Sequence, residues 1–187
     1  MKRFLARAAV AALSALSLAG CIDSASPILP DAQDLFGPKV RLQFYSLRKG
    51  FAHDPEQALY TWNGALYAHT SGGMREVTAF SVHPFEADDY IVQAVPAKRP
   101  SITDYALLHK VAEGVFQVIA IDEDDADEPT RAAYCKKSSQ SSCRIETKEQ
   151  LFAFARATAA RRKDDGGLAI RLPVGPEPAK RPARRRR

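Results

Sequence analysis

The sequence predicts an α+β domain: an antiparallel β-meander of about six or seven strands with one packed C-terminal helix. Three local patterns support this fold class. Asn63-Gly64 lies between two strand-like segments and is typical of a type I′ hairpin turn. The apolar segments 105–111 and 115–121 are separated by a very short connection, which makes them antiparallel neighbours. Thr147 and Gln150 have capping-box spacing and predict the start of a helix.

The strand-like segments follow one another without an intervening helix, which indicates a meander and not βαβ units. In the first strand Val40, Leu42 and Phe44 alternate with polar residues and form the expected buried face. Pro84 is expected to end a strand because proline cannot donate to a β-ladder. Whether the sheet stays open or closes into a small barrel is left open. The expected meander strands are 40–45, 58–62, 65–69, 74–82, 90–95, 105–111 and 115–121. The expected helices are 129–135 and 147–162, and a final strand follows at 168–172.

The charge of the chain is divided unevenly along its length. The formal net charge is +5, but basic residues gather before residue 8 and after residue 179, where no acidic residue lies. The part between, 21–179, holds 18 basic and 22 acidic residues and has a charge of −4. Because the basic charge is terminal and not spread over a folded face, we expect no nucleic-acid partner.

The N-terminal segment has the layout of a secretory signal, with a basic start, an apolar run over 8–18 and small residues after it. Leu18-Ala19-Gly20-Cys21 closes this segment and resembles the lipobox of bacterial lipoproteins. The resemblance implies that the chain is cleaved before Cys21. It also implies that the Cys21 sulfur carries a diacylglyceryl group and its amine a fatty acid such as palmitate. The lipid bilayer would then be the first partner.

Two alternatives to the lipobox stay open. The segment is then either an ordinary signal peptide followed by an incidental cysteine or an uncleaved anchor. The apolar run is shorter than the roughly 20 residues that span a bilayer. A lipoprotein would be lipid-anchored in the bacterial cell envelope and face the periplasm or the exterior. Ile22 in place of aspartate after the lipid cysteine resembles the outer-membrane sorting pattern and favours that membrane.

The resemblance leaves two further cysteines, Cys135 and Cys143. In an oxidising compartment an even pair of cysteines predicts a disulfide, and the spacing is not that of a Cys-x-x-Cys redox or zinc motif. The expected organisation is a signal peptide over 1–20, a tether over 21–38, one α+β domain over 39–172 and a disordered basic tail over 173–187. The tether is inferred from its prolines and its lack of periodicity.

The C-terminal tail is rich in proline and arginine and has little to bury. We expect its basic side chains to contact an anionic envelope surface, such as the phosphates of phospholipid or lipopolysaccharide, as a second contact for the anchor. A merely solubilising end is the alternative. The residues concerned are Lys180, Arg181, Arg184, Arg185, Arg186 and Arg187.

No pattern in the sequence predicts a metal or cofactor site. The acidic run 122–128 lacks the glycine that bends a calcium loop, so a solvated loop is expected. The four histidines are not at metal-ligand spacing, and His109 is expected to be half-buried beside Tyr105 and Leu107. Rings of the expected strands, such as Trp62 and Tyr60, are assigned to the core, although exposure of some of them stays open.

We therefore expect a membrane-anchored, non-catalytic binding or accessory protein of the envelope, whose ligand and protein partner the sequence does not identify. Nucleophile elbows, phosphate-binding glycine loops and dinucleotide fingerprints do not occur in the sequence. The alternative is an enzyme or enzyme inhibitor that acts on cell-envelope polymers, because catalytic residues can converge from distant positions.

Overall fold

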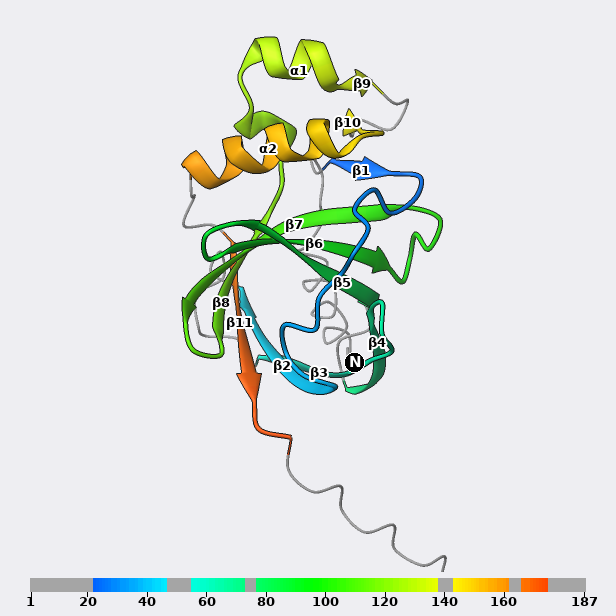
Figure 1. Cartoon of the computed structure of the whole chain (residues 1–187), viewed down its shortest axis with the longest axis vertical. Helices are drawn as coiled ribbons and strands as arrows, with labels where there is room; N and C mark the ends of the chain where they lie inside the picture. The colour runs from blue at the N-terminus through cyan, green and yellow to red at the C-terminus, as the bar shows by residue number, and fades with distance from the viewer. Residues whose placement is uncertain (1–21, 47–54, 73–76, 138–142, 162–165, 175–187) are drawn as a thin grey trace, which may run out of the picture.

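The computed structural model describes residues 22–46, 55–72, 77–137, 143–161 and 166–174. Eight strands form a closed barrel in the order β6-β5-β4-β3-β2-β11-β8-β7, and β6 pairs with β7 to close it (Figure 1). The fold is thus mostly antiparallel β with helices added, as predicted. The barrel of eight strands is larger than the meander of about six or seven strands that the sequence predicts. Its strands are β2 (Lys39–Ser46), β3 (Glu56–Trp62), β4 (Tyr67–Gly72), β5 (Val77–Glu86), β6 (Asp89–Pro96), β7 (Thr103–Ala112), β8 (Val115–Ala120) and β11 (Gly167–Leu172).

Apolar side chains from strands all around the barrel meet in its interior. Val40 and Leu42 of β2 are 0% and 3% exposed, so the predicted alternation holds. The ring of Phe80 lies 4.9 Å from that of Tyr60 and 5.0 Å from that of Tyr67, measured between centroids. This interior cluster consists of Phe36, Val40, Leu42, Ala58, Tyr60, Tyr67, Phe80, Val82, Leu108, Phe116 and Ala169. The barrel is therefore packed with its own side chains.

The hairpin between β3 and β4 is confirmed, but its turn differs from the prediction. Trp62 pairs with Tyr67, so the loop is longer than a type I′ turn allows. The side-chain Oδ1 of Asn63 accepts hydrogen bonds from the backbone N–H groups of Ala65 (3.0 Å) and Leu66 (2.9 Å). Gly64 has a φ of +98°, which favours glycine. Asn63 thus forms the loop through its side chain as well as its backbone.

The helix α2 (Lys148–Arg161) covers one outer face of the barrel. Its capping box is confirmed: Gln150 N–H donates to Thr147 Oγ1 (3.3 Å), and Thr147 N–H donates to Gln150 Oε1 (3.1 Å). The inner face of the helix consists of its buried residues, Leu151, Phe154, Ala155 and Thr158. Leu151 and Phe154, both 0% exposed, pack in one cluster with residues of β6, β7 and β8. The core therefore has two parts, inside the barrel and beneath α2.

A small second set of elements lies at the end of the barrel near α2 (Figure 1). The parallel pair β1 (Asp23–Ser24) and β10 (Cys143–Arg144) extends from β7, and β9 (Lys136–Lys137) follows β10. The helix α1 (Glu128–Tyr134) has Pro129 in its first turn, as predicted, and Asp127 as its N-cap. A short 3₁₀ turn, η1 (Glu123–Asp125), precedes it.

Residues 22–38 are not a tether, which corrects the sequence-based domain boundary. Ile22 and Phe36 are 0% and 2% exposed, and each belongs to one of the two core clusters. Low periodicity misled the prediction because this segment pairs with the barrel at scattered points. Only two of its residues form a strand. Its prolines therefore mark an irregular path over a surface and not a free linker.

The expected strand end at Pro84 is also wrong, because β5 continues to Glu86. The pairing with β6 shifts register between Pro84 and Glu86, which is typical of a β-bulge. On its other side β5 pairs with β4 only at Ala79 and Phe80. The missing N–H of Pro84 therefore costs no ladder hydrogen bond to β4.

Candidate functional site

The candidate site is the contact between the barrel and residues 22–38, which we call the N-terminal strap. The strap starts at β1, crosses the outer face of β5 and β6 and ends where Phe36 enters the barrel interior. Its backbone bonds to the fold along this path: Ile22 N–H donates to Ile121 O (3.2 Å), and Gln33 N–H donates to Val82 O (2.9 Å). If the chain is cleaved before residue 21, the domain includes the second residue of the mature chain, Ile22.

Gln93 of β6 makes the densest set of hydrogen bonds to the strap. Its Oε1 accepts from the backbone N–H groups of Ile28 and Leu29, each at 2.8 Å, and its Nε2 donates to Leu29 O at 3.0 Å. A backbone N–H can only donate, so these partners fix which end of the amide is oxygen. The Nε2 end also lies 2.7 Å from Nε2 of His83 and donates to it.

His83, which is 4% exposed, is held in its neutral form by two neighbours. Its Nδ1 lies 2.9 Å from Pro30 O, and a carbonyl only accepts, so Nδ1 carries the proton. Its Nε2 then accepts from Gln93. Burial lowers the pKa of His83 below 6.5, against the opposing effect of the Pro30 carbonyl. A second proton on Nε2 would face the Gln93 N–H, so this contact requires a neutral imidazole.

A second polar contact lies at the start of the strap, where two carboxylates are buried side by side. Asp23 of β1 and Asp104 of β7 are cross-strand partners and are 2% and 4% exposed. Arg144 Nε lies 3.2 Å from Asp23 Oδ1, and Arg99 Nη2 lies 2.9 Å from Asp104 Oδ2. Within the described chain, the buried Oδ1 of Asp104 has no hydrogen-bond partner. The two arginines therefore offset these charges only in part.

The electrostatics of Asp104 follow from that arrangement. Burial raises its pKa above the ordinary value of 3.8, and the negative charge of Asp23 raises it further, whereas Arg99 opposes both effects. Other contacts hold β1 in place beside this pair: Ile145 N–H donates to Asp23 O (2.9 Å), and the hydroxyls of Ser24 and Tyr105 lie 2.7 Å apart. The start of the strap is thus fixed by backbone and side-chain bonds together.

The last part of the strap closes one end of the barrel. Phe36 packs edge-on against Phe116 and Tyr67, with ring centroids 5.2 Å and 5.6 Å apart. The Tyr67 hydroxyl accepts from Phe36 N–H at 2.8 Å and donates to the Asp34 carboxylate. Burial and the bond to Asp34 both raise the pKa of Tyr67. Tyr67 is therefore a neutral hydrogen-bonding link between strap and barrel.

Of the predicted site residues, the structure describes the two cysteines of the expected disulfide. The other predicted site residues lie outside the described part of the chain. Cys135 and Cys143 form the expected disulfide, with Cα atoms 5.1 Å apart. It links the end of α1 to β10 beside the strap. Cys21 and the basic residues Lys180, Arg181 and Arg184 to Arg187 lie outside the described residues. Their expected lipidation and anionic contact stay predictions.

Ligand atoms of Glu123, Cys135 and Cys143 lie within 4.8 Å of one another, the one such group that the described residues contain. Both sulfur atoms are used in the disulfide, so the oxidised protein offers only a carboxylate there. A thiolate is the form of cysteine that ligates metal. This group is therefore a structural link in the oxidised protein.

The acidic run caps helices and pairs with arginine. Asp122 caps η1, Asp127 caps α1, and Arg131 lies 2.8 Å from Glu128 and 3.4 Å from Asp124. The solvated loop that the sequence predicts is therefore wrong in part, because the run forms η1 and the start of α1, and Asp125 and Ala126 are 5% and 2% exposed.

The histidines are distributed over separate places in the fold. His109 is half-buried, as predicted, and its Nδ1 lies 2.6 Å from Asp89 Oδ1. His69 packs against Tyr60, with ring centroids 5.6 Å apart, and His83 lies under the strap. His53 lies outside the described residues.

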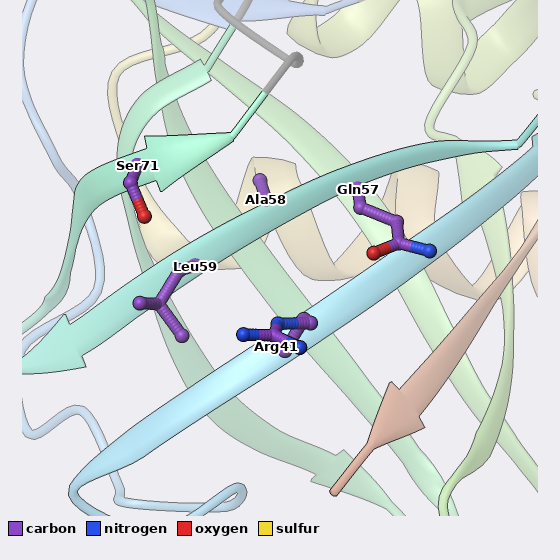
Figure 2. Close-up of a pocket in the computed structure, with 5 residues that line it drawn as sticks. All are labelled: Arg41, Gln57, Ala58, Leu59 and Ser71. Atoms are coloured by element: carbon purple, nitrogen blue, oxygen red, sulfur yellow. The ribbon is translucent and has the colours of Figure 1, made fainter. Parts of the chain in front are cut away.

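A shallow hollow lies on the outer surface of the described residues. It has a volume of about 230 Å³ and lies over β2, β3 and β4, lined by Arg41, Gln57, Ala58, Leu59 and Ser71 (Figure 2). Rings that the sequence left open for exposure, those of Tyr60 and Trp62, pack with the interior cluster, and Leu59 faces outward to the hollow. Most small-molecule pockets are larger, about 300–1,000 Å³.

No family model, no curated protein and no solved structure matches this chain. In the described part of the chain, the helices are all too short or too polar to cross a membrane. The site therefore has to be judged on its own geometry.

Sequence reasoning missed the strap, with its buried Asp23, and the partners of the strap, Gln93 and Asp104. A signal was present in the apolar residues Leu29 and Phe36, which a solvated linker does not need. Their partners could not be read from the sequence, because Gln93 lies more than sixty residues away from Leu29. A single polar residue in a strand has no pattern that identifies its role.

Proposed function

We propose that this protein is a lipid-anchored, non-catalytic binding or accessory protein of a bacterial envelope. One observation carries the proposal: the buried Ile22 directly follows the expected lipid cysteine, Cys21, and is hydrogen-bonded into the fold. An anchor at Cys21 would thus join the barrel without an intervening linker. Two or more acyl chains would hold the protein stably on a membrane.

The packing of the barrel supports binding through the outer surface. Barrels that carry small ligands enclose them in their interior. Here Phe36, Tyr60, Tyr67, Phe80 and Phe116 occupy that space. The described exterior has a hollow of only about 230 Å³, which is smaller than a typical ligand pocket. A macromolecular surface fits this shape better than a small molecule.

The alternative, an enzyme or enzyme inhibitor that acts on envelope polymers, has less support. A serine hydroxyl and a histidine imidazole do meet in the described residues, because Ser81 Oγ lies 2.8 Å from His83 Nε2. A serine nucleophile needs an imidazole that takes its proton and access for substrate. In this protein Gln93 donates to the same nitrogen, and the strap covers the pair. These contacts of His83 therefore hold the strap on the barrel.

The anchor is tested by mass spectrometry of the mature N-terminus, together with membrane fractionation of wild type and Cys21→Ser. We expect an acylated Cys21 in the membrane fraction and release of the substituted protein. An unacylated wild-type N-terminus would refute the lipid anchor.

The non-catalytic part is tested by photo-cross-linking in the native envelope from position 57 or 71, which lie in the hollow, with position 130 on α1 as the control. A macromolecular adduct from the hollow but not from the control is expected. Cleavage of purified envelope polymer by the full chain would contradict the proposal.

A further inference from the structure

Three side chains that are able to ligate metal meet at the disulfide. The Sγ atoms of Cys135 and Cys143 and a carboxylate oxygen of Glu123 all lie within 4.8 Å of one another. They come from three separate elements: Glu123 from η1, Cys135 from the C-cap of α1 and Cys143 from β10. Reduction would convert the sulfurs to thiols, whose thiolates bind metal. Thiolates and a carboxylate together are ligands that Zn²⁺ accepts.

The distance between the carboxylate and one sulfur fits zinc. Cys135 Sγ lies 3.4 Å from Glu123 Oε2. In a tetrahedral site with Zn–S of about 2.3 Å and Zn–O of about 2.1 Å, a sulfur and an oxygen ligand lie about 3.6 Å apart. The two sulfurs would have to separate to about 3.8 Å, from the roughly 2 Å of a disulfide. Because the Cα atoms of the two cysteines are 5.1 Å apart, rotation about the Cα–Cβ bonds allows this separation without backbone movement.

Each ligand is positioned by contacts that do not use the sulfur atoms. The Asp122 carboxylate caps η1, the turn that carries Glu123. Cys135 N–H donates to Arg131 O (2.9 Å) at the end of α1. Cys143 is 1% exposed, and its strand β10 is paired with β1. Reduction of the disulfide therefore leaves these contacts in place.

The acidic run beside the site favours a cation. Residues 122–128 include six acidic side chains, of which Glu123 is one. Two arginines pair with members of the run: Arg131 with Asp124 and Glu128, and Arg161 with Asp125 at 3.9 Å. The run therefore keeps an excess of negative charge, which attracts a divalent cation.

The site is also accessible. Glu123 and Cys135 are partly exposed, whereas Cys143 is buried, so an ion would enter from the side of η1 and α1. Arg144 follows Cys143 in β10 and pairs with Asp23. Consecutive strand residues point to opposite faces, so this guanidinium does not compete for the site.

We propose that reduction of the disulfide creates a zinc site, in which the thiolates of Cys135 and Cys143 and the Glu123 carboxylate hold the ion and water is the fourth ligand. The reductant is a dithiol, whose own oxidation to a disulfide supplies two electrons and two protons to the sulfurs. Zn²⁺ then displaces both thiol protons and keeps its oxidation state. An oxidising disulfide reverses these steps: it takes the two electrons, the S–S bond forms again, and the ion is released. The inference does not depend on the lipid anchor.

Cobalt binding to the reduced chain tests the site. The mature full chain carries Cys21→Ser, so only the two cysteines of the disulfide are present. A phosphine reduces it, because a dithiol would bind the metal itself. We expect a near-ultraviolet thiolate-to-cobalt charge-transfer band that saturates at one Co²⁺ per chain and disappears when equimolar Zn²⁺ is added. A reduced chain without this band would overturn the proposal.

Glu123→Gln tests the carboxylate ligand. Loss of an outer-shell partner costs about 10–100-fold in metal affinity, and loss of a direct ligand should cost at least as much. The matched control is Glu128→Gln, which removes the same charge from an exposed position of the same run. It should change zinc affinity by less than about threefold, because exposed charges are screened by salt. Equal zinc affinities of Glu123→Gln and wild type, measured against a competing chelator dye, would overturn the three-ligand site.

Reoxidation tests the redox dependence. Oxidised glutathione added to the zinc-loaded chain should release zinc to a zinc-sensitive dye in step with the loss of free thiols. The double variant C135S/C143S should neither bind zinc at the wild-type affinity nor respond to the oxidant. Zinc that stays bound after the thiols have disappeared would overturn the redox dependence, as would binding by the oxidised wild type with the affinity of the reduced chain.

Discussion

The strap has two buried polar contacts with the barrel, one made of neutral groups and one made of charged groups. At Gln93 and His83 all groups are neutral, and each polar atom of the Gln93 amide has a partner in the strap or in His83. At Asp23 and Asp104 two like charges are buried side by side, and Asp104 Oδ1 has no hydrogen-bond partner in the described chain. The neutral contact stabilises the folded state, whereas the charged contact combines attraction with a desolvation cost.

This difference gives the two contacts opposite responses to acid. His83 has a lowered pKa in the folded protein, so the unfolded chain takes up its proton first as the pH falls below 6.5, and stability is lost. Asp104 has a raised pKa, so the folded protein takes up a proton first, and stability is gained as the pH falls toward 3.8. Acid should therefore weaken the contact at Gln93 and His83 in the middle of the strap. It should reduce the repulsion between Asp23 and Asp104 at the start of the strap.

The largest effect is expected for Gln93→Leu. This change removes the acceptor for two buried N–H groups, those of Ile28 and Leu29, and should lower the free energy of unfolding by about 3 kcal/mol. Urea unfolding measures the change. Gln57→Leu, at an exposed position of β3, is the control and should stay within about 0.5 kcal/mol of wild type. Similar midpoints for both variants would refute the role of Gln93.

The disulfide should support the charged contact. It closes a short loop between Cys135 and Cys143 next to Arg144, so the double substitution of both cysteines to serine should cost about 2–3 kcal/mol. Thermal unfolding under non-reducing conditions measures this cost, with the reduced wild type as the comparison. If reduction leaves the stability of wild type unchanged, the link contributes nothing to the fold.

His83→Asn separates the neutral contact from the rest of the pH dependence. The Asn amide can donate to Pro30 O but has no nitrogen that takes up a proton, so we expect a loss of about 1 kcal/mol at pH 8. Between pH 7 and pH 5 the wild type should lose stability relative to this variant, and the gap should narrow. A gap that is constant across this range would show that His83 does not titrate with unfolding.

The smallest effect on stability is expected for Asp104→Asn, and its pH dependence should have the opposite sign to that of His83→Asn. The amide oxygen can still accept from Arg99, and a buried charge is removed, so stability at pH 7 should change by less than about 1 kcal/mol. Urea midpoints from pH 7 to pH 4 should show that the wild type gains on the variant as Asp104 takes up its proton. A wild type that loses ground to the variant on acidification would contradict the raised pKa.

The sequence was informative where contacts are local. The α2 capping box needs only Thr147 and Gln150, and the alternation of Val40 and Leu42 needs only one strand, so both could be predicted. Barrel closure could not, because the pairing of β11 with β2 and with β8 leaves no mark in any of these strands alone. The strap was missed for the same reason: its partners are distant, and its irregular backbone looks like a linker.

Hydrogen exchange of the strap amides tests most directly whether the domain begins at residue 22. The amides of Ile22, Ile28 and Leu29 are each bonded to a group in the barrel or beside it. A strap that is part of the fold predicts protection factors of these amides close to those of β6 and β7, because such bonds open only with the structure around them. Exchange of these three amides at the rate of an unstructured peptide, with β6 and β7 protected, would show that residues 22–38 are a tether.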